Sequence, residues 1–258
     1  MHFPAKLIDA LCAASHVTVL TGAGVSAESG VPTFRDAQSG LWARYRPEDL
    51  ATPEAFLANP PLVWAWYAWR RKLAGDVKPN PGHAALAEME ARLVGRGARF
   101  TLITQNVDGL HQRAGSRNVI ELHGNIGRVR CFDEGFLVDA TLVDTDGTAP
   151  ASASVAPPRC PRCGGLLRPD VVWFGEMLPA AALQAAYEAA AACEVFLSIG
   201  TSALVQPAAS LPLLAVQAQA LLVEINPQET PLTASAAYFL QGKSGEVLPR
   251  LLASASLG

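Results

Sequence analysis

The sequence predicts an α/β fold in which helices cover both faces of a parallel sheet. Short apolar runs rich in β-branched residues recur along the chain, at residues 17–20, 100–104, 119–122, 195–199 and 220–225. Stretches with the helical spacing of apolar residues separate most of these runs. A glycine-rich turn follows the first run directly. Alternating strands and helices with such a turn are typical of a doubly wound, Rossmann-like sheet.

The glycine-rich turn has the sequence TGAGVSA, which fits the G-x-G-x-x-A pattern of dinucleotide sites. Gly22 permits the tight turn and Gly24 lets backbone approach a pyrophosphate, while the first N–H groups of the next helix are expected to face the anion. A dehydrogenase would add an acidic residue after a second strand about 20 residues on. The chain has the Gly/Pro-marked loop 30–36 there instead. We therefore expect a dinucleotide site without the hydride-transfer arrangement.

Composition narrows the class of protein. The chain has 258 residues, of which 50% are apolar and 17% charged, so it can bury a large core. A net charge of -3 gives no reason to expect nucleic-acid binding. We see neither a signal peptide nor a membrane span and expect a cytoplasmic protein. Five cysteines without an export signal favour metal binding or core packing over disulfides.

Taken in order, the chain begins with a helix over 5–15 that leads into the first strand. Residues 36–75 are aromatic-rich and helical in pattern, with Pro53 and Pro60 at helix starts. A helix over 84–96 precedes the second strand. Helices over 179–192 and 207–217 lie between the later strands.

Residues 126–169 differ in character from their surroundings. They contain short polar runs, an Ala/Ser/Pro-rich stretch at 147–158 and a Cys-Pro-Arg-Cys segment. We expect a single catalytic domain over 1–258 in three parts. These are a Rossmann-like large lobe (about 1–35, 76–125 and 170–258), a helical insertion (about 36–75) and a small zinc-binding-type module (about 126–169).

Polar residues follow the ends of five predicted strands. Ligands of doubly wound sheets bind at the carboxyl ends of the strands. We therefore expect one edge of the sheet to carry residues 22–26, residues 105–108, His123, residues 200–202 and Asn226.

Several motifs along the chain together resemble those of one family. In order they are GAGVSAESGVPTFRD, TQNVDGLH, LHG, PDVVWFGE, GTS and VEIN, and they resemble the sirtuins, which are NAD-dependent protein-lysine deacylases. The resemblance covers about residues 10–251. Residues 47–73 further resemble the class III branch, whose members favour acidic acyl groups.

The resemblance implies a reaction that consumes NAD. The acyl-lysine amide oxygen attacks C1′ of the nicotinamide ribose, nicotinamide leaves, and water finally releases lysine and O-acyl-ADP-ribose. It implies that His123 is the general base, with Asn106 and Asp108 completing the catalytic set. Histidine suits this role because it titrates near neutral pH. Standing alone, His123 would be interpreted as a structural residue at a strand end.

The resemblance also implies which residues contact NAD. Phe34 would shield the reactive ribose and Arg35 would pair with phosphate. Asn226 would take the adenosine ribose in place of the missing acidic residue. For residues 106–109 the alternative is a turn chosen for its backbone conformation. The full set is Gly22, Ala23, Gly24, Glu28, Phe34, Arg35, Gln105, Asn106, Asp108, Gly200, Thr201, Ser202, Asn226 and Ser244.

Tyr67 and Arg70 carry the prediction of acyl preference. At i and i+3 on a helix they share one face, where a guanidinium can hold a carboxylate and a phenol can add a hydrogen bond. The resemblance implies that this pair recognises malonyl, succinyl and glutaryl lysine, and that Ala51 leaves room for a longer acyl chain. Alternatively, Tyr67 is core among tryptophans while Arg70 and Arg71 are solvated.

The PDVVWFGE segment is expected to bind the substrate peptide. Residues 172–176 would pair with it as a strand, mainly through backbone, so the choice of peptide sequence would be loose. The residues are Val172, Phe174, Gly175 and Glu176.

The cysteines depart from the family pattern. Cys160-x-x-Cys163 fits a zinc knuckle, and the resemblance implies a second such pair. Cys131, however, is followed three residues on by Glu134. Three outcomes stay open: structural zinc on three thiolates with Glu134, Asp133 or water as fourth ligand, weak binding, or no metal. We expect no catalytic metal, because the implied mechanism needs none.

Two other functions are weighed. Mono-ADP-ribosyl transfer would use the same cleavage of NAD with a different acceptor. A non-catalytic NAD or ADP-ribose sensor would keep the sheet without the chemistry, and His123 and Asn106 argue against it. The expected partners are acyl-lysine side chains of proteins, and the resemblance to compact sirtuins implies a monomer.

Overall fold

The computed structural model describes residues 3–32, 45–139 and 156–255. Its main element is a six-stranded sheet in the order β3-β2-β1-β7-β8-β9, with every neighbouring pair parallel. The strand order reverses between β1 and β7, which is where ligands of doubly wound sheets bind. The strands are β1 (His16–Thr21), β2 (Arg99–Thr104), β3 (Val119–Glu121), β7 (Val195–Ile199), β8 (Leu221–Asn226) and β9 (Tyr238–Gln241). The predicted Rossmann-like fold is confirmed.

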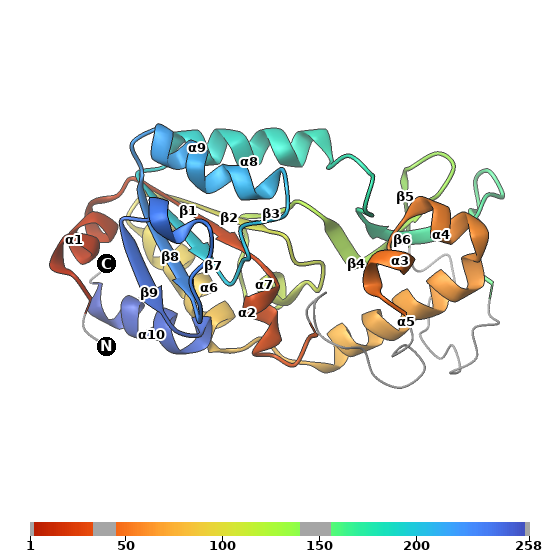
Figure 1. Ribbon diagram of the computed structural model, residues 1–258, viewed down its shortest axis with the longest axis horizontal. Coiled ribbons are helices and arrows are strands. Elements are labelled where there is room, and N and C mark those ends of the chain that lie inside the picture. The colour runs from red at the N-terminus through yellow and green to blue at the C-terminus, as the bar shows by residue number, and fades with distance from the viewer. Residues whose placement is uncertain (1–2, 33–44, 140–155, 256–258) are drawn as a thin grey trace.

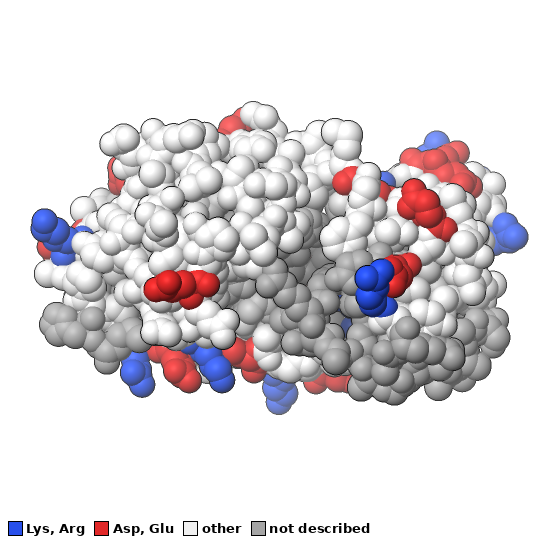
Figure 2. All heavy atoms as spheres, in the orientation of Figure 1, with Lys and Arg blue, Asp and Glu red and all other residues white. Residues whose placement is uncertain are grey.

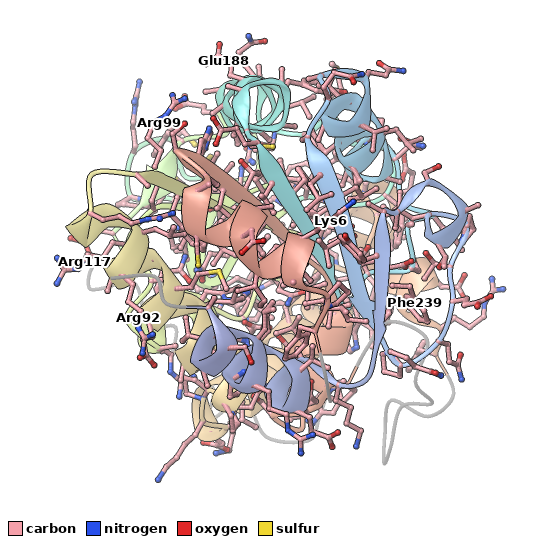
Figure 3. The ribbon with its side chains drawn as sticks, turned by 90° about the vertical axis from the view of Figure 1, so that its left-hand side faces the viewer. Lys6, Arg92, Arg99, Arg117, Glu188 and Phe239 are labelled. Carbon is pink, nitrogen blue, oxygen red and sulfur yellow. The ribbon has the colours of Figure 1, made fainter. Side chains whose placement is uncertain are left out.

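Helices cover both faces of this sheet (Figures 1 and 3). On one face lie α1 (Ala5–Ala13), α6 (Pro81–Gly95) and α10 (Ser244–Ser254), and on the other α8 (Ala180–Ala192) and α9 (Leu211–Gln217). Side chains of β1 alternate between the two cores: Val17 and Val19 pack with the first group and Leu20 with the second. Because both faces are covered, β1 is buried at every position, which explains its continuous apolar run.

Most of the remaining described segments form a second lobe, which lies to the right in Figures 1 and 2. A three-stranded antiparallel sheet in the order β5-β4-β6 consists of β4 (Gly124–Cys131), β5 (Leu137–Val138) and β6 (Leu167–Val171). Against it pack α3 (Pro47–Leu50), α4 (Pro53–Ala58) and α5 (Pro60–Asp76) (Figure 1). A shared apolar cluster that includes Phe56, Trp66 and Trp173 joins the two groups. The pattern predicted the helices but not these strands.

Pro53 and Pro60 stand where the sequence places helix starts. Thr52 Oγ1 accepts from Ala55 N–H, and Asn59 Oδ1 accepts from Leu62 N–H, so each proline follows an N-cap. Such caps satisfy amides that have no partner within the helix. The two caps explain why one proline-punctuated stretch forms two helices.

Short elements complete the connections. They are α2 (Ala23–Ala27), α7 (Leu110–Arg113) and the 3₁₀ turns η3 (Ala208–Ser210) and η4 (Thr233–Ser235). The helix expected over 84–96 begins earlier, at Pro81, because Asn80 caps it. The sequence pattern predicted neither β9 nor α10. Within the described residues no helix is long and apolar enough to cross a membrane.

Candidate functional site

Glycines bring the ends of β1 and β7 into contact. The N–H of Gly22 donates to Ile199 O at 3.1 Å, and that of Gly24 donates to Gly200 O at 2.8 Å. A Cβ on Gly24 would lie 2.7 Å from Gly200 O, closer than real Cβ atoms approach. Gly200 itself has a φ of 60°, which favours glycine. The glycine-rich turn is therefore required first by the close approach of two strand ends.

This contact corrects one expectation about the turn. The amides of Gly24 and Val25 donate inside the protein, to Gly200 O and Gly22 O. The expectation that the first N–H groups of the following helix face an anion is wrong for these two groups. The reason is that α2 is only five residues long and packs its first turn on the β7 end.

Carboxamide side chains link the strand ends at this edge, some to the turn after β1 and some to Thr201 after β7. Asn106 is 8% exposed, and its Nδ2 donates to Gly22 O and Ser26 Oγ, both at 3.0 Å. Gln105 Nε2 donates to Thr201 Oγ1 at 3.1 Å, and Asn226 Nδ2 donates to Thr201 O at 2.8 Å. The structure thus brings residues after β1, β2, β7 and β8 to one edge, as the sequence predicted.

His123 follows β3 and reaches the same edge. Its Nδ1 lies 3.0 Å from Gln105 O, and because a carbonyl oxygen only accepts, Nδ1 carries the proton in the neutral ring. Burial lowers the pKa of His123 below its usual value, an effect that the bond to Gln105 partly offsets. At pH 7 the ring is therefore neutral, with Nε2 unprotonated and able to accept a proton.

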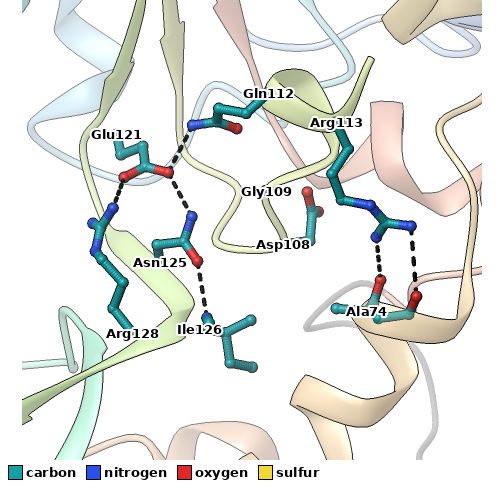
Figure 4. A pocket seen from close by; sticks show the side chains of 11 residues that line it. Ala74, Asp108, Gly109, Gln112, Arg113, Glu121, Asn125, Ile126 and Arg128 are labelled. Atoms are coloured by element: carbon teal, nitrogen blue, oxygen red, sulfur yellow. Dashed lines mark hydrogen bonds and ion pairs between the residues drawn. The ribbon is translucent and has the colours of Figure 1, made fainter. Parts of the chain in front are cut away.

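Asp108 lies between this edge and a pocket of about 520 Å³ (Figure 4). Asp108 Oδ1 accepts from Leu110 N–H at 2.9 Å, which fixes the turn before α7. In the pocket, Glu121 accepts from Gln112 at 2.8 Å and Asn125 at 2.7 Å and pairs with Arg128. None of these pocket residues was singled out from the sequence, where they carry no motif.

Two residues that were predicted to contact NAD, Glu28 and Ser244, form hydrogen bonds within the protein. Ser244 Oγ donates to Glu28 Oε1, and Gly245 N–H donates to Glu28 Oε2 at 3.1 Å. This pair ties α2 to α10. Phe34 and Arg35 lie outside the described residues.

The predicted acyl residues lie together in the second lobe. Ala51, Tyr67 and Trp173 belong to one apolar cluster, and Phe174 N–H donates to Ala51 O at 2.9 Å. Tyr67 is 1% exposed, so its side chain is packed among these apolar neighbours. The Arg70 guanidinium lies 4.8 Å from the centre of a Trp66 ring.

Arg71 is not solvated as that alternative supposed. Its Nε donates to Ile126 O at 2.8 Å, and its guanidinium lies 5.4 Å from the centre of a Trp64 ring. Burial lowers its pKa. The two neighbouring arginines therefore both pack on tryptophans rather than extend into solvent.

The segment expected to pair with substrate as a strand is a turn. β6 ends at Val171, and Gly175 has a φ of 86°. The N–H of Val172 donates to His123 O at 2.9 Å and that of Trp173 to Glu176 Oε2 at 2.8 Å. The amide of Phe174 donates to Ala51 O, so these three amides of the segment have partners within the chain, and its pairing with a substrate peptide stays a prediction.

Three cysteines converge although they come from distant segments. The sulfur atoms of Cys131, Cys160 and Cys163 all lie within 4.8 Å of one another, and none forms a disulfide. Glu134 N–H points at Cys131 Sγ, 3.4 Å away, a contact suited to a thiolate. Three sulfurs this close fit a tetrahedral zinc with one further ligand.

Glu134 does not join this cluster. Its carboxylate pairs with Arg162 at 3.5 Å, and no carboxylate belongs to the group within the described residues. Asp133 is also outside the group, but its carboxylate and Cys163 are both neighbours of Gly165: a Cβ there would lie 2.0 Å from Asp133 Oδ2 and 3.3 Å from Cys163 Sγ.

Comparisons with known proteins agree with this site. A family model described as "Sir2 family" matches residues 22–207. The NAD-dependent protein deacylase 2 of Pyrobaculum aerophilum is 53% identical over 249 residues, which cover 96% of this chain and 94% of that protein. The NAD-dependent protein deacylase 1 of Pseudomonas aeruginosa is 49% identical over 98% of this chain and 99% of that protein.

A solved structure gives the same result in three dimensions. The crystal structure of a Sir2 homolog–NAD complex superposes with a TM-score of 0.88 at 49% identity, covering 100% of this chain and 96% of that chain.

Proposed function

Because this chain belongs to the Sir2 family and is an NAD-dependent protein deacylase, we propose that it removes acidic acyl groups from protein lysines. The groups are succinyl, malonyl and glutaryl, with acetyl as a further substrate. The products would be nicotinamide, free lysine and O-acyl-ADP-ribose. The observation that carries the proposal is Tyr67 beside Arg70 in the second lobe. We call the part of this lobe that is formed by Ala51, Tyr67, Arg70 and Trp173 the acyl wall.

His123 is assigned the general base. Its neutral ring at pH 7, with Nδ1 held by Gln105 O, leaves Nε2 to take a proton from a ribose hydroxyl. The reacting hydroxyl then attacks the acyl carbon bound to lysine. Asn106 and Asp108 act beside it, one holding the β1 turn and one the start of α7.

The strand-end edge is assigned the NAD site. It lies at the reversal of strand order, and a pyrophosphate there would meet residues 22–24 and 200–202. Asn226, which donates to Thr201 O, would receive the adenosine ribose, and Gln105, which donates to Thr201 Oγ1, would receive the nicotinamide ribose. NAD supplies the electrophilic C1′ carbon that the acyl oxygen attacks.

We assign binding of the acyl group to the acyl wall. Arg70 and Tyr67 interact electrostatically; Tyr67 is buried and Arg70 half-buried, and reduced contact with water strengthens a hydrogen bond to a carboxylate. Ala51, a small residue of the same apolar cluster as Tyr67, would leave room for a longer acyl chain. An acetyl group would lose these contacts without meeting repulsion, so it remains a substrate.

A structural zinc is assigned to the three cysteines. It would join β4 to the segment before β6, with Cys131 from one and Cys160 and Cys163 from the other. The fourth ligand would be Asp133 or water, because Glu134 is paired with Arg162. No step of the reaction passes through this site.

Mass spectrometry of matched acetyl-, succinyl- and malonyl-lysine peptides, with and without NAD, tests the acyl preference. We expect NAD-dependent loss of succinyl and malonyl ahead of acetyl. Arg70→Met should lower succinyl removal by about 10–100-fold, the scale of a charged hydrogen bond, and leave acetyl removal unchanged. Arg71→Met, which changes the neighbouring arginine, is the matched control and should not change the ratio.

Three other outcomes would each favour a different function. Loss of acetyl alone would keep the deacylase and remove the acidic preference. Release of nicotinamide without loss of any acyl mass would favour ADP-ribosyl transfer. Binding of NAD with neither product would favour a sensor.

A further inference from the structure

A tryptophan outside the predicted site makes a buried hydrogen bond to the proposed acyl reader. The indole Nε1 of Trp173 lies 2.9 Å from the hydroxyl oxygen of Tyr67. Both side chains are 1% exposed, and their rings lie 6.2 Å apart at 33°. Trp173 comes from the turn after β6 and Tyr67 from α5, so the bond joins the two halves of the second lobe.

The direction of this bond is fixed by chemistry. An indole N–H can only donate, so the Tyr67 oxygen must be the acceptor. The phenol proton of Tyr67 is then directed away from Trp173. Burial, the largest effect, raises the pKa of Tyr67 to about 12, so the hydroxyl keeps its proton at neutral pH. Tyr67 is thereby left as a hydrogen-bond donor toward any further partner.

We propose that Trp173 is a specificity-determining positioning residue, which orients the Tyr67 hydroxyl as a donor to the carboxylate of an acidic acyl group. The inference rests on the proposed acyl preference and names a further residue for it. An acetyl group has no carboxylate to receive this proton. Its removal should therefore not depend on the direction of the Tyr67 hydroxyl.

Trp173 is itself held by charged and aromatic neighbours. The Arg168 guanidinium lies 3.3 Å from the centre of a Trp173 ring and pairs with Glu176. Phe56 packs against the same residue with ring centres 5.4 Å apart. The Trp173 amide also donates to Glu176. Because the ring is fixed in this way, its N–H has little freedom to leave Tyr67.

The charges around Tyr67 fit the same role. Arg168 is 4% exposed, and the carboxylate of Glu176 neutralises it. Arg70 acts on Tyr67 as a positive charge, and the two residues lie three positions apart in α5, which places them on one side of the helix. A carboxylate can accept from both, whereas a neutral acyl group cannot use the charge.

Trp173→Phe removes the N–H and keeps an aromatic ring. We expect KM for a succinyl-lysine peptide to rise about 3–10-fold, the scale of one hydrogen bond, with kcat unchanged. Both constants for the acetyl-lysine peptide should stay within about 2-fold of the wild type. In a Tyr67→Phe background the same substitution should have no further effect on succinyl removal.

Two further variants test whether the effect of Trp173→Phe comes from the lost N–H or from a general change in structure. Trp64→Phe makes the same change at a tryptophan that packs on Arg71, and it should leave the succinyl-to-acetyl ratio unchanged. Replacing Trp173 with benzothienylalanine exchanges only the N–H for sulfur and keeps the shape. It must reproduce the selective rise in KM if Trp173→Phe folds poorly.

The outcomes separate this inference from the proposed function. Equal losses for acetyl and succinyl peptides in either Trp173 variant, or an equal loss in the Tyr67→Phe background, would overturn the role of Trp173. If the wild type removes no acidic acyl group at all, the proposed preference fails and this inference fails with it. Succinyl removal by the wild type that neither Trp173 variant alters would overturn this inference alone.

Discussion

The strand-end edge and the acyl wall are built by different kinds of contact. At the edge, the turns after β1 and β7 touch through backbone atoms, and carboxamides bridge the gaps. The wall consists of aromatic rings from α5 and the turn after β6, joined by one buried side-chain hydrogen bond. Backbone contacts leave little room for substitution, whereas packed side chains can be exchanged for others of similar volume. We infer that the edge sets the reaction and the wall sets the acyl group.

The strongest test of this division is His123→Asn, at the edge. It removes the proposed base, so we expect kcat to fall by about 10²–10⁴-fold for succinyl- and acetyl-lysine peptides alike. Binding of NAD, measured by calorimetry, should persist because Asn106 and the glycine turn are untouched. A loss confined to one acyl group would contradict the division.

Removal of the metal would test whether the second lobe depends on its cysteines. Cys160→Ala should reduce bound zinc from about one atom per chain to near none, since two thiolates alone rarely retain it. Zinc released on denaturation, measured with a colorimetric chelator, gives the stoichiometry. Cys12→Ala is the matched control, because Cys12 lies in α1 and outside the cluster. Unchanged zinc in the Cys160 variant would refute the assignment.

Gly24→Ala should show how tightly the edge is packed. Its Cβ would lie 2.7 Å from Gly200 O, so we expect a loss of about 1–3 kcal/mol in the free energy of unfolding, with weaker NAD binding. Gly95→Ala, at the end of α6, adds a Cβ that would meet no other part of the protein within 4 Å, so it should be neutral or slightly stabilising. Urea unfolding of both variants makes the comparison. Equal stabilities would mean that the two turns can move apart.

The smallest expected effect is on the acid limb of the pH profile. Burial lowers the pKa of His123 below 6.5, so its neutral, active form persists into mildly acidic solution. Activity should be present above the pKa that His123 has in the folded protein, and it should be lost only as the pH falls through that pKa. We therefore expect the acid limb of log kcat/KM to lie below pH 6.5 for both acyl groups. A midpoint above 6.5 would contradict the assignment of this limb to His123.

The same comparison separates what the sequence predicted from what it did not. The edge was predictable because each motif directly follows an apolar run, and parallel strands bring their carboxyl ends together. Even there, the sequence did not reveal that Gly24 contacts Gly200, or that Glu28 pairs with Ser244 across the chain. Nor did it reveal that residues 172–176 form a turn, in which Val172 N–H donates to His123 O, Phe174 N–H to Ala51 O and Trp173 N–H to Glu176.

The sequence by itself determined the alternation of strands and helices, the strand-end residues and the family. These depend on local periodicity and short motifs, which act within a few residues. Only the tertiary structure decided that Trp173 donates to Tyr67 and that Cys131 meets Cys160 and Cys163. Contacts of this kind join residues that are 106 and about 30 positions apart, and no local pattern encodes their approach. Packing of distant segments within the second lobe sets them.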